Sequence, residues 1–394
     1  MGSAERRIVV ALVTDAILPW HRGGKELRYH EIGRRLASRA DVHVYTMNWW
    51  RGARTLERDG VTLHAISPLL PLYSGERRSV RQAVVFAASC LRLLGRRFDV
   101  IEADHMPYLP LLALRLVASV RRTRLVVTWH EVWGPAYWRR YLGRLGAVGW
   151  WFERFAMRLP DRIIAASSET AARLSAHVGA RTAVTVAANG VDFDLIDRVS
   201  AAPDARDLVA VGRMLPHKRV DLLIDALALL RARGTPLTCR IIGDGPERDS
   251  LQRRARERGV EQLIEFRHDV HDQEELYSLL KCARAFAFPS EREGFGIAAL
   301  EALACGLPVV TTSAPDNLAR ALVARSACSV VCAPTPEAFA DGICDVLVRS
   351  AGVEQHEWLC EFDWAAVADR VADVLLDADR DPTPSIPIPT PDHA

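Results

Sequence analysis

Several absences limit what this 394-residue chain can be. Its eight cysteines are scattered and form no C-x-x-C pair, so we interpret them as buried free thiols of a reducing compartment. No apolar run approaches the length of about 18 residues that a membrane span needs, and no cleavable apolar stretch is apparent near the N-terminus. We therefore expect a cytoplasmic protein, or one at most peripheral to the inner face of the membrane.

Other absences concern charge and motifs. The net charge of +2 argues against a general nucleic-acid binder, so no nucleic-acid partner is expected. The sequence contains no Walker A motif, no H-E-x-x-H and no G-x-S-x-G. A G-x-G-x-x-G motif after the first expected strand is also missing, which disfavours a NAD-dependent dehydrogenase.

Two short acidic or histidine-rich patterns look like metal ligands, and we interpret both otherwise. Asp192-Phe193-Asp194 is a D-x-D sequence, but it falls in the segment expected to join two domains. His268-Asp269-x-His271-Asp272 precedes a helical pattern and is better interpreted as a turn followed by a helix N-cap. No metal site is therefore predicted.

What the chain does contain is a repeated alternation of strand and helix patterns. A length of 394 residues is enough for two or three domains, and a hydrophobic fraction of 49% allows two sizeable cores to be buried. Buried strands separated by helices indicate parallel sheets covered on both faces. The first series predicts strands at Ile8–Thr14, Val42–Met47, 99–101, Arg124–Thr128 and Arg162–Ala165; the second predicts Leu208–Val211, Cys239–Ile242, Ile264–Phe266, Ala285–Phe288, Pro308–Thr311 and 330–331.

The predicted fold class is α/β, with two Rossmann-like doubly wound domains facing a central cleft. Polar and small residues near 189–205 interrupt both patterns, so we place the first domain at 1–190 and the second at 191–360. Residues 379–394 are rich in proline and poor in core-forming residues, which predicts a disordered tail. Ligands of such sheets bind at the carboxyl ends of the strands.

The segment from Pro289 to Glu301 is the most informative part of the sequence. Gly294 and Gly296 permit a close approach of backbone to ligand, and the free N–H groups of the helix that starts here can hold a diphosphate. Glu293 lies in the loop and Glu301 two turns into the helix, where a carboxylate can accept hydrogen bonds from a pair of hydroxyls. The alternative is a helix start that merely carries solvated acids.

Two cations, Arg213 and Lys218, follow the expected strand Leu208–Val211. Cations at a strand end suit a pyrophosphate leaving group, because they neutralise its developing charge without a metal ion. The alternative is an exposed basic loop.

Together these motifs resemble the retaining family-4 glycosyltransferases of the GT-B fold (glycosyl transferases group 1). The resemblance covers about 10–375 and is more specific in the second half. It lies in Gly212-Arg213-x4-Lys218, Gly243-Asp-Gly-Pro-Glu247, Glu293-Gly-Phe-Gly-x4-Glu301, the interdomain segment Asn189–Asp192 and the N-terminal glycine loop Gly23-Gly24. Phe362-Asp-Trp364 resembles the start of the family's closing helix, which implies that 361–378 packs back on the first domain.

The resemblance implies a role for each matching residue. The first domain would bind the acceptor and the second the nucleotide-sugar donor. His130, after the strand Arg124–Thr128, matches the position whose histidine faces the reacting sugar, although a lone histidine at a strand end is usually structural or solvated. The other implied roles are diphosphate binding by Arg213 and Lys218, sugar contact by Glu293, ribose contact by Glu301, backbone contacts by Gly294, Phe295 and Gly296, further donor contacts by Gly23 and Gly24, and a place near the nucleobase for Val270.

The implied reaction moves a sugar from a nucleoside-diphosphate sugar to an acceptor hydroxyl, with retention of configuration and with neither metal nor bound cofactor. The resemblance favours a front-side route in which the leaving phosphate takes the acceptor proton. Two alternatives stay open: a sugar-nucleotide epimerase of the same fold, and a non-catalytic sugar-nucleotide-binding subunit. The presence of every expected site residue argues against the second.

The acceptor is expected to be a small molecule, a glycan or a lipid-linked compound. The stretches 77–97 and 121–162 are basic, and within the second the segment 137–155 mixes arginines with aromatic residues. This segment indicates either an amphipathic helix packed on the first domain, or an acceptor wall or membrane-surface patch.

Glycosyl transfer should survive removal of divalent cations, because two side-chain cations and a helix start meet the donor phosphates. The measurement is the turnover rate before and after treatment with EDTA. A loss of activity that Mn²⁺ or Mg²⁺ restores would instead implicate Asp192 and Asp194, or the cluster at His268.

Overall fold

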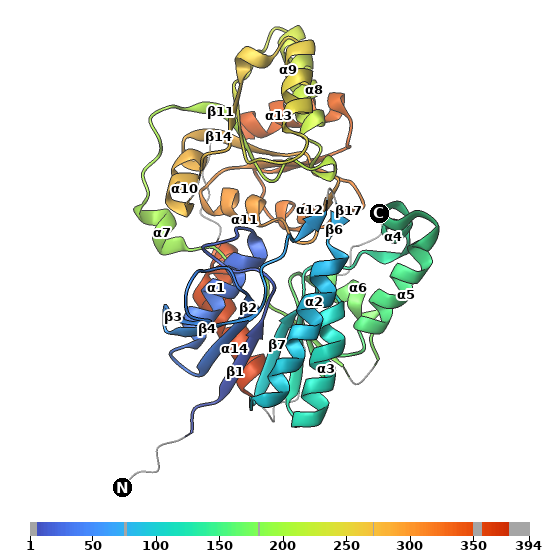
Figure 1. The fold of residues 1–394 in the computed structure, drawn as a ribbon. Coiled ribbons are helices and arrows are strands. Elements are labelled where there is room, and N and C mark those ends of the chain that lie inside the picture. Colours follow the sequence, from blue (N-terminus) through green and yellow to red (C-terminus); the bar gives the residue numbers. More distant parts are fainter. Residues whose placement is uncertain (1–5, 75–76, 180–181, 271, 350–356, 378–394) are drawn as a thin grey trace. The chain divides into compact units, whose positions relative to one another are not determined.

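The computed structural model describes residues 6–74, 77–179, 182–270, 272–349 and 357–377. They form two compact units (Figure 1). Unit 1 consists of Met1–Asn189 together with Trp364–Ala394, and unit 2 of Gly190–Asp363. The tail predicted at 379–394 lies outside the described residues.

Unit 1 is built on an eight-stranded sheet with the order β10-β9-β8-β7-β1-β2-β4-β3. All neighbouring strands are parallel except β3 and β4. The sequence predicts β1, β2, β7, β8 and β9, but not β3, β4 or β10. The strands are β1 (Val9–Val13), β2 (Asp41–Met47), β3 (Thr55–Arg58), β4 (Val61–Ser67), β7 (Val100–Asp104), β8 (Arg124–Trp129), β9 (Arg162–Ala165) and β10 (Ala183–Val186).

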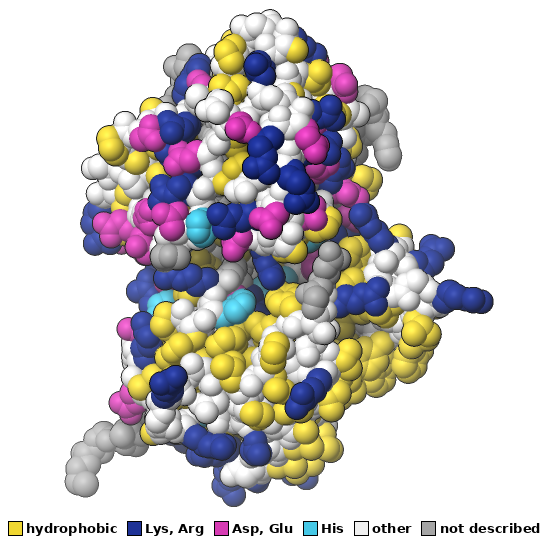
Figure 2. All heavy atoms as spheres, turned by 45° about the horizontal axis from the view of Figure 1, so that its top comes forward, with side chains coloured by type: hydrophobic (Ala, Val, Ile, Leu, Met, Phe, Trp, Pro, Cys, Tyr) yellow, Lys and Arg dark blue, Asp and Glu magenta, His cyan; other side chains and the backbone are white. Residues whose placement is uncertain are grey.

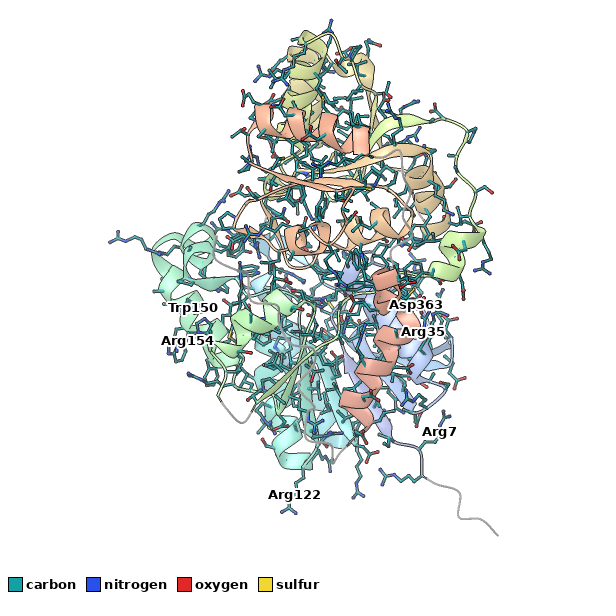
Figure 3. All side chains as sticks on the ribbon, turned by 180° about the vertical axis from the view of Figure 1, so that it is seen from behind. Arg7, Arg35, Arg122, Trp150, Arg154 and Asp363 are labelled. Atoms are coloured by element: carbon teal, nitrogen blue, oxygen red, sulfur yellow. The ribbon has the colours of Figure 1, made fainter. Side chains whose placement is uncertain are left out.

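Helices cover both faces of this sheet (Figures 1 and 3). Successive residues of a strand point to opposite faces, so Val10 and Leu12 enter one core while Ala11 and Val13 enter the other. The first core lies under α1 (Gly24–Leu36) and α14 (Trp364–Leu376), which contact each other. The second lies under α2 (Val80–Cys90), α3 (Leu109–Arg121), α4 (Gly134–Leu142), α5 (Gly146–Ala156) and α6 (Ser168–Ser175).

Unit 2 has a six-stranded, fully parallel sheet with the order β13-β12-β11-β14-β16-β18. All six strands lie where the sequence predicts them, which confirms the predicted α/β class. They are β11 (Arg206–Val211), β12 (Cys239–Ile242), β13 (Ile264–Arg267), β14 (Ala283–Phe288), β16 (Val309–Thr312) and β18 (Val330–Cys332). The helices are α7 (Phe193–Arg198), α8 (Val220–Ala232), α9 (Arg248–Glu257), α10 (Gln273–Lys281), α11 (Ile297–Ala304), α12 (Ala319–Val323) and α13 (Pro336–Arg349).

The order of strands reverses once in each sheet. In unit 1 the reversal lies between β1 and β7, and in unit 2 between β11 and β14. Connections on the two sides of such a reversal leave toward opposite faces of the sheet, so the loops separate at the carboxyl ends of these strands and leave room for a ligand. The residues that follow β1, β7, β11 and β14 are therefore the places where sites are expected.

The structure also describes the state of the cysteines and the lengths of the helices. All eight cysteines are free, and burial raises the pKa of the Cys239 thiol to about 12, so this thiol is protonated at neutral pH. Within the described ranges, no helix is both long and apolar enough to cross a lipid bilayer.

Candidate functional site

A lysine and a glutamate far apart in the sequence meet at the strand reversal of unit 2. Lys218 ends a short 3-10 helix, η3 (Pro216–Lys218), and its Nζ donates to Oε1 of Glu293 at 2.5 Å. The ammonium also lies 5.7 Å from the ring centre of Phe288, the last residue of β14. Arg213 is exposed in the loop after β11. The structure thus brings Lys218 and Glu293 together, and places Arg213 at the end of the neighbouring strand.

Glycines hold the loop of Arg213 against the loop that follows β12. Gly243 has a φ of +139°, and a Cβ there would lie 2.1 Å from the carbonyl oxygen of Gly212. A Cβ on Gly245 would lie 2.4 Å from the carbonyl oxygen of Met214, whose amide donates to Asp244 at 2.9 Å. Only glycine permits this close packing of two backbones. The Gly243-x-Gly245 pair therefore fixes the path of the loop that carries Arg213.

Gly296 shapes the start of α11. It has a φ of +89°, and a Cβ there would lie 2.4 Å from the Cβ of Ala319. The preceding residues form β15 (Arg292–Glu293), which pairs with β17 (Asp316–Asn317), and the amide of Leu318 donates to the carbonyl of Glu293 at 3.0 Å. Phe295, which precedes Gly296, is buried, and its ring centre lies 5.8 Å from that of Phe362. The backbone of Glu293 and Gly294 is thus held at the start of the helix.

Glu301 lies deeper in the same helix and is buried. Its Oε1 accepts a hydrogen bond of 2.7 Å from Nε2 of Gln273. Burial raises the pKa of this carboxyl to about 7, and the bond from Gln273 offsets only part of that rise. A buried carboxylate with a single neutral donor is well suited to accept further hydroxyl groups.

The loop after β13 holds the residue expected near a nucleobase. Val270 is half-buried and follows Asp269, whose carboxylate pairs with Arg267 at 2.6 Å. His268 is exposed, and its Nδ1 lies 3.0 Å from a guanidinium nitrogen of Arg248. Asp272 caps α10 by accepting from the amide of Glu275 at 2.7 Å, whereas His271 lies outside the described residues.

The D-x-D sequence has a local structural role. Asp192 caps α7, because its Oδ1 accepts from the amide of Leu195 at 2.9 Å. In the part of the chain that the structure describes, no group of three or more histidine, cysteine, aspartate or glutamate side chains is arranged to hold a metal ion.

The strand reversal of unit 1 carries a network of charges that the sequence analysis missed. Lys25 on α1 lies with its Nζ 2.5 Å from Oδ1 of Asp15 and 2.9 Å from Oδ2 of Asp104. Asp15 follows β1 and Asp104 ends β7, so the lysine bridges the two strands at the reversal. Arg78 contacts the other oxygen of Asp15 at 2.9 Å. Although burial opposes it, the Lys25 ammonium keeps the pKa of the Asp104 carboxyl far below its usual range.

His130 joins this network from the end of β8. Its Nε2 lies 3.6 Å from Oδ1 of Asp104, and Nδ1 of His105 lies 3.2 Å from the same oxygen. Burial lowers the pKa of the His130 imidazole to about 3, since the opposing effect of Asp104 is too small to offset it. The imidazole is therefore neutral at physiological pH. Its Nε2 is buried, and among the described residues it has no hydrogen-bond partner.

Gly23 and Gly24 lie at the start of α1, beside a carboxylate that already occupies it. Gly23 is fully extended, and a Cβ there would lie 2.5 Å from Oε2 of Glu26. Burial raises the pKa of Glu26, but the hydrogen bond from His21 and the charge of Lys25 bring it down to about 2. This anion competes with any phosphate at the helix start, so a donor contact by the two glycines stays a prediction.

Two family models match the chain. The model described as Glycosyltransferase Family 4 matches residues 22–195, and the one described as Glycosyl transferases group 1 matches 192–357. The first match contains Lys25, Arg78, Asp104 and His130 of the network in unit 1 but begins after Asp15, and the second contains the Lys218–Glu293 pair.

Curated relatives are similar over part of their length. The chain is 32% identical to the glycogen synthase of Mycobacterium tuberculosis (strain ATCC 25618 / H37Rv) over 249 residues, which is 60% of this chain and 59% of that protein. It is 31% identical to the GDP-mannose-dependent alpha-(1-6)-phosphatidylinositol monomannoside mannosyltransferase of Mycolicibacterium smegmatis, over 55% of this chain and 62% of that protein. The matched regions thus span less than two thirds of these relatives.

Solved structures share the fold over nearly the whole chain. Sucrose-phosphate synthase from Thermosynechococcus elongatus superposes with a TM-score of 0.73 at 17% identity, covering 93% of this chain and 98% of that chain. The HepE protein of Anabaena in complex with UDP-glucose superposes with a TM-score of 0.68 at 20% identity, covering 93% and 99%. At these identities the likeness shows a common fold.

The stability of the protein should fall with rising pH through the titration of Glu301. Its pKa rises from an ordinary value near 4.5 to about 7, so the folded state keeps a proton that the unfolded state releases. This contribution is full below about 4.5, is lost as pH rises through about 7, and amounts to about 3 kcal/mol. The difference in unfolding free energy between wild type and Glu301→Gln should therefore change across this range.

The comparison with wild type is needed because burial also raises the pKa of Glu102, in unit 1, to about 7. The exposed Glu257 provides the control, and Glu257→Gln should keep the pH dependence of the wild type. A pH-independent difference between wild type and Glu301→Gln would show that the pKa of Glu301 is the same in the folded and unfolded states.

Proposed function

This chain belongs to the family-4 glycosyltransferases of the GT-B fold, and from this membership we propose that it transfers a sugar from a nucleoside-diphosphate sugar to an acceptor hydroxyl. The observation that carries the proposal is the Lys218–Glu293 pair at the strand reversal of unit 2, with Arg213 on the neighbouring loop. Transfer proceeds with retention of configuration and without a metal ion. Unit 2 binds the donor and unit 1 the acceptor.

The donor diphosphate is proposed to lie against Arg213, Lys218 and the start of α11. Charge builds on the leaving phosphate as the glycosidic bond breaks, and two fixed cations with free backbone amides stabilise it. The Anabaena structure contains UDP-glucose, and one curated relative is named as GDP-mannose-dependent. Both support a nucleoside-diphosphate sugar, and they differ in base and in sugar.

The two glutamates are proposed to serve different parts of the donor. Glu293 precedes Gly294 in the loop, so its carboxylate contacts hydroxyls of the transferred sugar while orienting Lys218. Glu301 is buried just over one turn into α11 and receives the ribose hydroxyls. Hydroxyl donors favour the charged carboxylate, so donor binding lowers the pKa of Glu301 and releases a proton near neutral pH.

In unit 1, His130 is proposed to contact the reacting sugar as a neutral imidazole. Its depressed pKa means that it offers a hydrogen bond rather than a positive charge. Asp104 keeps a negative charge at the adjacent strand end, where it is suited to accept from a hydroxyl of the acceptor. The leaving phosphate takes the acceptor proton in the front-side route.

The acceptor is proposed to be a small molecule, a glycan or a lipid-linked compound. The names of the curated relatives include a glycogen synthase and a phosphatidylinositol monomannoside mannosyltransferase, which support the glycan and the lipid-linked classes. The free cysteines support a reducing compartment, which we take to be the cytoplasm.

Replacing Lys218 by alanine should weaken binding of nucleoside diphosphates by about 1.5–3 kcal/mol, the range for hydrogen bonds to a charged group. Arg213→Ala should act in the same direction. Titration calorimetry with UDP, GDP, ADP and dTDP measures the effect and identifies the preferred base. The matched control is Arg284→Ala, because Arg284 is exposed at the amino end of β14 and pairs with Asp207 at 2.9 Å.

Unchanged affinity in both the Arg213 and Lys218 variants would remove these residues from the donor site. An equal loss of affinity in Arg284→Ala would show that the loss reflects the lower positive charge of the protein rather than a contact with the diphosphate.

A further inference from the structure

One helical layer of unit 1 exposes an unusual amount of apolar surface. We call the exposed side of α2, α3, α4 and α5, with the short 3-10 helices η1 (Leu91–Gly95) and η2 (Gly143–Leu145), the α2–α5 face. The four helices cover the same side of the sheet (Figure 1). Apart from Leu69, every large hydrophobic residue that is exposed in the described part of unit 1 lies on it. They are Val80, Val84, Leu91, Leu116, Val120, Leu145, Val148, Trp151 and Phe155.

On α5 these residues form one stripe. Leu145, Val148, Trp151 and Phe155 follow one another at spacings of three or four residues, which places them on one side of the helix. Trp151 is 65% exposed, and its ring stacks on Phe155 with centroids 5.8 Å apart and planes at 6°. Large aromatic side chains are thus presented to solvent on a regular helix.

The orientation of this stripe is fixed by the opposite side of α5. Glu153 is completely buried and accepts hydrogen bonds from Nε1 of Trp138 at 2.7 Å and from the hydroxyl of Tyr108 at 2.9 Å. Gly149 packs so closely on Trp138 that a Cβ would lie 2.3 Å from the indole ring. α5 therefore cannot rotate to bury Trp151 without losing these contacts.

The same layer is strongly basic. Residues 77–158 contain 15 arginines, no lysine and five acidic residues, whereas the whole chain has a net charge of only +2. Three of the five acids, Glu102, Asp104 and Glu153, are buried. Figure 2 shows hydrophobic and basic side chains over the visible surface of unit 1 with few acidic ones, whereas acidic and basic side chains alternate over unit 2.

Arginines flank the apolar stripe directly. Arg144, Arg154 and Arg158 are exposed on or beside α5, and the guanidinium of Arg154 lies 6.0 Å from the ring centre of Trp150. Figure 3 labels this pair on α5 and Arg122 at the end of α3. The face thus combines aromatic and aliphatic side chains with guanidinium groups and almost no exposed carboxylate.

We propose that the α2–α5 face docks on the surface of a lipid bilayer that contains anionic lipids. Apolar and aromatic side chains of an interfacial helix enter the boundary between headgroups and acyl chains, while arginines pair with the lipid phosphates. Docking of this kind is peripheral and reversible, and it weakens as salt screens the charges.

Two other occupants fit the observations less well. A second copy of the chain would bring two strongly basic faces together, since a symmetric dimer uses the same surface on both subunits. A nucleic acid would neutralise the arginines but would leave Trp151, Val148 and their neighbours on α2 and α3 exposed to water.

The test is flotation of the full chain with vesicles of phosphatidylcholine alone or mixed with phosphatidylglycerol, at low and at high salt. We expect binding to the mixed vesicles at low salt, a large loss at high salt, and weak binding to phosphatidylcholine. No donor or acceptor is present, so the result is independent of the glycosyl-transfer proposal.

Matched variants separate the two contributions. Arg144→Glu with Arg154→Glu should lower the vesicle partition coefficient by about tenfold or more, given a free-energy gain of about 1 kcal/mol per basic residue near an anionic surface. Trp151→Ser with Phe155→Ser should also lower it by about tenfold, through the loss of buried apolar area. The control, Arg253→Glu with Arg256→Glu, changes exposed arginines of α9 in unit 2 and should bind as wild type does.

The proposal would be overturned by an absence of flotation with the mixed vesicles at low salt, or by α5 variants that bind as well as the wild type does. Sedimentation velocity of the free protein tests the alternative that a second copy of the chain docks on this face. A dimer that Trp151→Ser dissociates would show that the face joins two copies of the chain instead.

Discussion

The reversal of strand order in each sheet is the constraint on which both candidate sites depend. Connections leave the sheet toward opposite faces there, so polar side chains can meet at the strand ends without filling a core. Partly buried charges at such a place must be paired. Lys25 therefore bridges Asp15 and Asp104 in unit 1, and Lys218 pairs with Glu293 in unit 2. Each strand reversal thus combines room for a ligand with paired charges that could bind it.

The second half of the chain was the more predictable one. Its strands are short apolar runs separated by clear helices, and Arg213, Lys218 and Glu293 lie next to strand ends in the sequence itself. The charge network of unit 1 could not be predicted in the same way, because Lys25 meets Asp104 only once β1 and β7 are known to be neighbours. β10 was missed because it is a four-residue, half-buried edge strand without an alternating pattern.

Burial and close packing explain what else the sequence leaves open. The sequence predicts Glu301 two turns into a helix, whereas α11 (Ile297–Ala304) begins later and Glu301 is its fifth residue, just over one turn in. The rise of its pKa follows from the removal of water around it in the fold. Gly243 and Gly245 stand out as a motif, whereas their role in holding the Arg213 loop is visible only from the backbone of Met214 beside them. Likewise, the sequence alone does not show whether an aromatic, arginine-rich segment packs on its own domain or binds a partner. In the structure α5 packs on unit 1 through Glu153 and leaves Trp151 exposed.

We assign Glu293 to the transferred sugar and Glu301 to the ribose. Comparing the variants Glu293→Gln and Glu301→Gln tests this assignment most directly. Steady-state kinetics and calorimetry with the bare nucleoside diphosphate are sufficient. Glu293→Gln should lower kcat by about 100-fold while the diphosphate binds as well or better, because Lys218 is released from its carboxylate. Glu301→Gln should raise KM for the donor and weaken the binding of the nucleoside diphosphate. If Glu293→Gln loses diphosphate affinity and Glu301→Gln keeps it, the assignment of the two carboxylates is wrong.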